Sequence, residues 1–280
     1  MWNSIPRIPL GDWVEALIDF LVNNFSIVTK TFSNITDAGV TWIESSMFAL
    51  PPWLFIIIVA LLAWFTTKRK GVTVFTVVGL LFIWNINLWE PAISTVALVI
   101  VATLIAIIIG VPIGIFSALY EMVYKIVTPI LDFMQTLPAF VYLIPAISFF
   151  GLGKVPAIFA TVIFSVPPTI RLTALGIKQV PGDLIECADA FGSNKPQKLF
   201  KLQLPLAKTT IMAGINQTVM LALSMVVIAA MIGAKGLGSE VWRAIQRLQP
   251  GKGFEAGIGI VIVAIILDRI LQSITDKKKQ

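Results

Sequence analysis

The sequence predicts a polytopic, all-α membrane protein, and three observations support this fold class. Hydrophobic residues make up 57% of the chain and charged residues 13%, about half the charged fraction of an ordinary soluble domain. Residues 91–120, 133–153 and 209–234 contain no Asp, Glu, Lys or Arg, and a helix needs about 20 apolar residues to cross a bilayer. These apolar runs are continuous rather than alternating, which favours helices and excludes a transmembrane β-barrel.

We expect about seven transmembrane helices along the chain. Two accessory spans within residues 51–91 come first, at about 52–67 and 72–89. The last span is the weakest because it contains Asp268 and Arg269. These side chains can pair with each other or lie near the cytoplasmic end of the span, where long side chains reach the interface. The five later spans lie within residues 92–275, at about 92–119, 127–150, 155–177, 209–232 and 255–274.

The basic residues predict how the chain lies in the membrane. Cytoplasmic loops of membrane proteins carry the excess of Lys and Arg. Placing Lys68, Arg69 and Lys70 in the cytoplasm also puts the basic loop 178–208 and the tail 276–280 there, because the spans alternate in direction. The sequence therefore predicts a multi-pass protein of a bacterial plasma (inner) membrane, with the N-terminus outside and the C-terminus in the cytoplasm.

Residues 1–50 are expected to form an external tail that contains an amphipathic helix. Trp13, Leu17 and Phe20 recur at helical spacing, whereas Asp12 and Asp19 fall on another face. This pattern is typical of a helix that lies on membrane lipid at the outer interface. Anchoring or packing is the simpler function for such a helix, and bracing the protein or sensing lipid is the alternative.

Composition also limits the chemistry. The net charge of +6 does not indicate nucleic-acid binding, because most Lys and Arg residues flank spans. The chain has no histidine, which removes His-based catalytic triads, proton relays and His metal sites together. The single cysteine, Cys187, has no partner for an internal disulfide. We predict no catalytic residue, no metal site and no cofactor on this chain.

A polar motif separates the fifth and sixth spans. Asp183 is expected to cap a short helix, with Glu186 three residues later. Gly192 is expected to end that helix in the left-handed conformation, which glycine adopts without strain. A second short helix is expected at about 196–203, with Pro196 in its first turn. The motif residues are Glu186, Cys187, Ala188, Asp189, Ala190, Gly192, Leu202, Leu204 and Pro205.

Prolines inside the predicted spans mark places where helices bend. Bending helices are expected where a pathway opens alternately to each side of the membrane, and static kinks that only shape packing are the simpler interpretation. Asn216, Gln217 and Thr218 lie at membrane depth but suit helix–helix hydrogen bonds as well as a pathway, so the substrate-binding residues stay unknown. The candidate gate or kink residues are Pro138, Pro145, Pro167 and Pro168.

The segment 186–205 resembles the EAA loop of ABC-importer permeases, which reads Glu-Ala-Ala, three residues, Gly, nine residues and Ile-x-Leu-Pro. Cys187 stands in place of the middle Ala, and Leu202 in place of the Ile. Together with the proline-containing stretch 131–178, this loop resembles permeases of glycine betaine/proline (quaternary-ammonium osmoprotectant) ABC importers. The resemblance extends from about Trp53 to the C-terminus.

The resemblance implies a type I ABC-importer permease fold, with a core permease domain at 92–275 and a cytoplasmic coupling loop at 178–208. It also implies a homodimer of this chain, two ABC ATPase subunits that bind ATP and Mg, and an extracellular substrate-binding protein. The sequence contains no Gly-Lys-Ser/Thr phosphate-binding loop, so the ATPase must be a separate chain. Candidate docking charges for the binding protein follow the sixth span, at Lys235, Arg243, Arg247 and Lys252.

The implied function is ATP-driven import of glycine betaine/proline-type compatible solutes, with a role in osmoprotection. Substrate delivered by the binding protein would cross by alternating access, and this chain would catalyse no covalent step. Choline, carnitine or another small solute is the alternative substrate, because the motifs do not identify the ligand. A channel or an ion-gradient transporter is the alternative class. That class needs intramembrane charges or a selectivity filter, and the mid-membrane positions are nearly free of charge.

Overall fold

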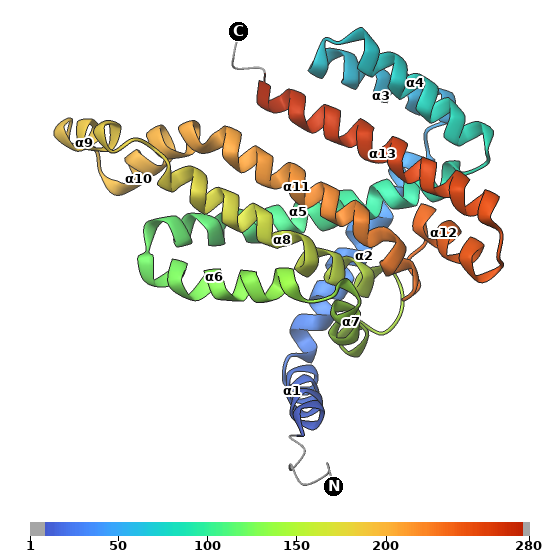
Figure 1. Cartoon of the computed structure of the whole chain (residues 1–280), viewed down its shortest axis with the longest axis horizontal. Helices are drawn as coiled ribbons and strands as arrows, with labels where there is room; N and C mark the ends of the chain where they lie inside the picture. The colour runs from blue at the N-terminus through green and yellow to red at the C-terminus, as the bar shows by residue number, and fades with distance from the viewer. Residues whose placement is uncertain (1–8, 277–280) are drawn as a thin grey trace, which may run out of the picture.

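A computed structural model describes residues 9–276 of the chain, and this part is almost entirely helical (Figure 1). No β-strand occurs between residues 9 and 276, so the predicted all-α class is confirmed. A 3₁₀ turn, η1 (Ala139–Tyr142), and a π turn, η2 (Leu199–Gln203), interrupt the α-helices. The helices are α1 (Leu10–Asn24), α2 (Ser26–Phe48), α3 (Pro52–Thr67), α4 (Lys70–Asn85), α5 (Trp89–Leu119), α6 (Glu121–Thr136), α7 (Leu143–Phe150), α8 (Lys154–Lys178), α9 (Gly182–Ala190), α10 (Lys195–Lys198), α11 (Leu204–Ala230), α12 (Leu237–Gln246) and α13 (Pro250–Asp276).

The centre of the bundle is formed by α5, α8 and α11, which lie side by side (Figure 1). Small residues at the contacts let these helices approach closely. A Cβ placed on Gly114 of α5 would lie 2.6 Å from Thr173 Cβ and 2.7 Å from the Ile170 carbonyl oxygen of α8. A Cβ placed on Gly214 of α11 would lie 3.0 Å from the Pro168 carbonyl oxygen of α8. The helices therefore meet with almost no side chain between their backbones at these two points.

Within the described residues, three helical segments are long and apolar enough to cross a membrane: α5, α8 and the continuous helix from Lys195 to Ala230. Two bent pairs, α2 with α3 and α6 with η1–α7, are long and apolar enough only when each pair is taken together. Helices also occupy the predicted spans at 52–67, 72–89 and 255–274, as α3, α4 and α13. The total of seven crossings stays a prediction.

The helix expected at 127–150 is not continuous, because the structure breaks it into two helical segments, and its crossing of the membrane as one span stays a prediction. α6 and the η1–α7 segment meet at a bend of 110°. Pro138 lacks the N–H that would continue the helix and disfavours helical geometry at the residue before it. Leu137 is accordingly extended, with a ψ of 134°. The Tyr142 hydroxyl donates a hydrogen bond to the Met134 carbonyl across this break.

The N-terminal region contains a second helix besides the amphipathic one. α2 packs on α5, α7 and α8, and its Glu44 carboxylate accepts hydrogen bonds from Ser94 of α5 and Lys154 of α8. These contacts attach the tail to the core. α1 exposes Trp13 and Phe20, as an interfacial helix requires, and its position on the outer face of the membrane stays a prediction.

Asp268, which lies within the last predicted span, is held by hydrogen bonds. Its Oδ1 accepts from Asn216 Nδ2 of α11 at 2.8 Å and from Gln272 Nε2 at 2.7 Å. The expected pair with Arg269 is present at the outer limit of ion-pair contact, with 3.9 Å between Arg269 Nε and Asp268 Oδ2. These contacts compensate for an ionisable side chain within a predicted span.

Candidate functional site

The predicted coupling motif begins on α9, a short helix at one end of the bundle (Figure 1). The expected cap at Asp183 is wrong. Pro181 occupies the N-cap with a non-helical ψ of 134°, and the helix begins directly after it, so Asp183 falls in the first helical turn. A carboxylate at that position still interacts favourably with the helix dipole. None of the α9 side chains is buried, so Glu186 and Cys187 are accessible to a partner.

The end of α9 has the conformation that the sequence predicts. Gly192 has a φ of +73°. Its N–H donates to the Asp189 carbonyl at 2.9 Å, and the Ser193 N–H donates to the Ala188 carbonyl at 3.0 Å. These two bonds form a Schellman motif, which satisfies carbonyls that a helix end would otherwise leave free. Gly192 thus determines the direction in which the chain leaves α9.

The chain then returns to the membrane as α10, and our sequence analysis missed the N-terminal cap of this helix. The Asn194 side chain accepts a hydrogen bond from the Gln197 N–H, and the Gln197 side chain accepts one from the Asn194 N–H, both at 2.9 Å. The signal was present as the Asn-x-x-Gln spacing of a capping box. Lys198 Nζ lies 2.5 Å from Asp189 Oδ1, so the returning segment is tied to α9.

The helix expected at 196–203 begins with Pro196 in its first turn, as predicted, but it is not separate, because α10, η2 and α11 form one continuous helix. In the π turn, the Leu204 N–H donates to the Leu199 carbonyl. The turn ends at Gln203, two residues before Pro205, which has no N–H to continue regular α-helical bonding. Leu202 and Leu204 are half-buried. The last part of the motif therefore lies where the continuous helix enters α11 and is not a separate helix in the loop.

Three of the four predicted docking charges lie together at the end of the bundle opposite α9, on and after α12 (Figure 1). Arg243, Arg247 and Lys252 line a hollow of about 240 Å³. Glu240 also lines it, and its Oε1 lies 2.8 Å from Arg243 Nη1. Lys235 is exposed but does not line this hollow. The structure thus brings together three of the four residues, and their docking function stays a prediction.

The predicted gate prolines occupy different structural positions. Pro138 lies at the break after α6, and Pro145 lies within the short helix α7. Pro167 and Pro168 are buried inside α8, which continues through both residues as one helix. Of these four residues, Pro138 alone separates two helical segments, and a gating function stays a prediction for all of them.

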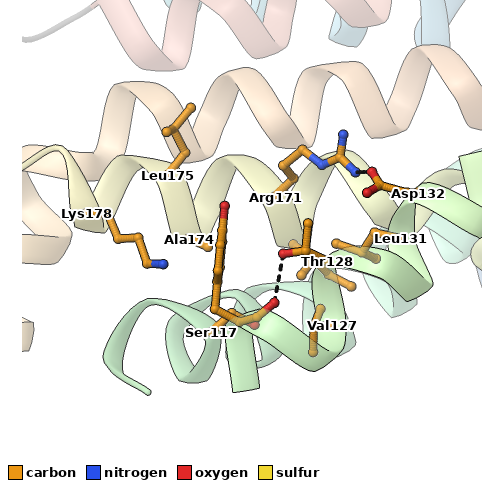
Figure 2. A pocket seen from close by; sticks show the side chains of 11 residues that line it. Ser117, Val127, Thr128, Leu131, Asp132, Arg171, Ala174, Leu175 and Lys178 are labelled. Atoms are coloured by element: carbon orange, nitrogen blue, oxygen red, sulfur yellow. Dashed lines mark hydrogen bonds and ion pairs between the residues drawn. The ribbon is translucent and has the colours of Figure 1, made fainter. Parts of the chain in front are cut away.

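A pocket that the sequence does not predict lies between α5, α6 and α8 (Figure 2). Its volume is about 280 Å³. Arg171 Nη2 lies 2.6 Å from Asp132 Oδ1, and Lys178 Nζ lies 3.2 Å from the centroid of the Tyr124 ring, which is a cation–π contact. Ser117 also lines the pocket, and its buried Oγ has no hydrogen-bond partner. These residues come from three different helices, so the pocket is recognisable only once the helices are packed together.

The described residues contain no group of His, Cys, Asp and Glu side chains that could hold a metal ion. What the fold presents instead is a bundle of apolar helices with one exposed polar helix between its two long central helices. This arrangement is that of a polytopic membrane protein. Residues 110–279, more than half of the chain, match the family model for the inner membrane component of binding-protein-dependent transport systems. The chain belongs to this family of ABC transporter permeases, which implies an ATPase and a binding protein as partners.

Individual relatives match along the whole chain. The glycine betaine transport system permease protein OpuAB of Bacillus subtilis is 55% identical over 277 residues, covering 99% of this chain and 98% of the relative. The glycine betaine/carnitine transport permease protein GbuB of Listeria monocytogenes is 53% identical over 282 residues, covering 99% of each. A solved structure of the MetNI methionine ABC transporter in an inward-facing conformation matches with a TM-score of 0.58 and 21% identity, covering 68% of this chain and 93% of that chain. This last likeness supports the type I permease fold.

Proposed function

We propose that this chain is the permease subunit of an ATP-driven importer of glycine betaine and related quaternary-ammonium compatible solutes, with a role in osmoprotection. One observation carries the proposal. Two relatives that match almost end to end, at 55% and 53% identity, are named as glycine betaine permeases. The name of the second also includes carnitine, so carnitine, choline or another small solute is the alternative substrate.

In the proposed assembly, two copies of this chain bind two ABC ATPase subunits, and α9 makes the contact with the ATPase. The exposure of α9 and the two-sided attachment of its ends to α8 and α11 support this role. ATP and Mg bind to the ATPase, and this chain performs no covalent catalysis. The N-terminus is outside and the C-terminus is in the cytoplasm. The binding protein docks at the opposite end, near Arg243, Arg247 and Lys252.

The proposed mechanism is alternating access. ATP-driven closure of the ATPase dimer displaces α9, and α8 and α11 carry the displacement into the bundle because they are the two helices on either side of α9. The two copies then move relative to each other as packed units, and the pathway opens outward to the loaded binding protein. Rigid-body motion of this kind requires tightly packed helices, and the α5–α8–α11 contacts meet that requirement.

Uptake of labelled glycine betaine into proteoliposomes that contain the permease, its ATPase and its binding protein tests the proposal. We expect uptake that needs both ATP and the binding protein. Uptake without ATP would indicate a channel, and uptake abolished by collapsing ion gradients would indicate an ion-gradient transporter. ATP-dependent uptake of choline or carnitine in place of glycine betaine would change the substrate only. Failure of any ATPase to copurify with the chain would refute the proposal.

A further inference from the structure

We propose that the pocket between α5, α6 and α8 is a low-affinity binding site for the transported solute, a small zwitterion with a quaternary ammonium group and a carboxylate. This inference rests on the proposed function. The pocket volume of about 280 Å³ lies just below the roughly 300–1,000 Å³ of sites for drug-sized ligands, so the pocket suits a small solute. Lys178, the last residue of α8, lines it, which places the pocket next to the start of the coupling loop.

Tyr124 marks the position of the ammonium group. The Lys178 ammonium lies over the Tyr124 ring, 3.2 Å from its centroid, so the ring face already binds a cation from this chain. Quaternary ammonium groups bind aromatic faces through the same attraction. The Lys178 side chain is exposed and has a flexible four-carbon stem. An incoming trimethylammonium group can therefore replace it on the ring.

Ser117 supplies a partner for the carboxylate. Ser117 is 1% exposed, and its Oγ lacks a hydrogen-bond partner even though the residue lines the pocket. A buried hydroxyl without a partner is unfavourable, and a ligand carboxylate would accept its hydrogen bond.

The two cationic residues mark opposite ends of the pocket. Arg171 and Lys178 are seven residues apart on α8, which is two helical turns or about 10 Å. Figure 2 shows Arg171 at one end of the pocket, paired with Asp132, and Lys178 at the other. Only one methylene separates the ammonium nitrogen from the carboxylate in glycine betaine, so the ligand does not reach from one end of the pocket to the other. The ammonium group would lie on the Tyr124 ring in place of Lys178, and the carboxylate would lie toward Ser117.

The test uses the complete complex of permease and ATPase in lipid nanodiscs, without the binding protein, so that the ligand site of the binding protein is absent. Saturation-transfer NMR on the N-methyl signal detects weak binding of glycine betaine to the complex. We expect a signal from the unmodified complex. The Tyr124→Leu variant should lower the affinity about two- to fivefold, the range for one exposed cation–π contact. The Tyr124→Phe variant, which keeps the ring, should retain the affinity.

Two further variants keep the proposal testable if Tyr124→Leu fails to assemble, as judged by size-exclusion chromatography. Lys178→Met removes the competing ammonium and should raise the affinity for glycine betaine. Ser117→Ala should lower the affinity for glycine betaine but leave the affinity for choline unchanged, because choline has no carboxylate. A merely structural Ser117 would affect both ligands equally, and that result would overturn its assignment to the carboxylate.

Failure of this inference is distinguishable from failure of the proposed function. Equal affinities of the Tyr124→Leu and Tyr124→Phe variants would overturn the binding site. Absence of a signal from the unmodified complex, while ATP-dependent uptake of glycine betaine is intact, would also overturn the site and leave the proposed function standing. Absence of uptake by the complete system with its binding protein would overturn the proposed function itself.

Discussion

Substitution of Gly192 tests the coupling loop directly, because it changes the backbone conformation and little else. Gly192 has a φ of +73°, and a Cβ at this position would meet no atom within 4 Å. Alanine therefore introduces no clash. It adds only the strain of an L-residue in the left-handed conformation, about 1–2 kcal/mol, and a free energy of this size changes a population by a factor of about 5–30.

We expect the Gly192→Ala permease to bind its ATPase about 5- to 30-fold more weakly, because strain reduces the population of the native turn. Asn tolerates the left-handed conformation better than Ala, so Gly192→Asn should lose less affinity. Titration of the purified permease with the ATPase gives the affinities directly. Uptake in proteoliposomes at limiting ATPase concentration should fall in the same order.

Gly182, the first residue of α9, provides a matched control. Gly182 is helical, has no left-handed φ and likewise has no atom within 4 Å of an added Cβ. Alanine is favoured over glycine in a helix by about 0.5–1 kcal/mol, so Gly182→Ala should bind the ATPase at least as tightly as the unmodified permease. Equal affinities of Gly192→Ala and Gly182→Ala would refute the argument that the left-handed turn orients the loop for its partner.

Three further predictions concern stability. Gly114→Ala places a methyl group 2.6 Å from Thr173 Cβ and should destabilise the permease by about 1–3 kcal/mol; its melting temperature should fall, whereas Gly257→Ala, in the interior of α13 with no atom within 4 Å, should not lower it, because alanine is favoured over glycine in a helix. Asn194→Ala removes the capping box and should destabilise the start of α10 by about 1 kcal/mol; unchanged hydrogen exchange there would contradict this. Glu44→Ala removes the hydrogen bonds that Ser94 and Lys154 donate to the carboxylate, and hydrogen bonds to a charged group are each worth about 1.5–3 kcal/mol. The variant should therefore increase protease cleavage of α2; cleavage at the unmodified rate would show that Glu44 does not attach α2 to the core.

The fold class was predictable from the sequence because it depends on composition and on long apolar runs. The left-handed Gly192 was predictable for a different reason. Glycine adopts a positive φ without strain, so the residue type alone predicts this conformation, whatever packs around Gly192. The Asn194 capping box has the same local character, and a closer reading of residues 194–197 would have found it.

Other features depend on information that a hydropathy pattern does not contain. Residues 133–153 contain no charged residue and are mostly apolar, so hydropathy alone cannot show that the chain turns through 110° within this run. Pro138 was identified, but a proline can kink a helix or end it, and the neighbouring packing decides which. The pocket was beyond prediction because Ser117, Tyr124 and Arg171 come from three different helices.

The continuous helix from Lys195 to Ala230 links the two ends of the molecule. It contains 36 residues and is therefore about 54 Å long, from the return of the coupling loop to the turn that leads into α12 (Figure 1). Close contact at Gly214 and a 2.7 Å hydrogen bond between Thr169 and Thr218 join it to α8. Close packing leaves these helices little freedom to slide past one another, because interiors resist compression. A displacement of α9 should therefore change the position of α12 and its charged hollow rather than be absorbed within the bundle.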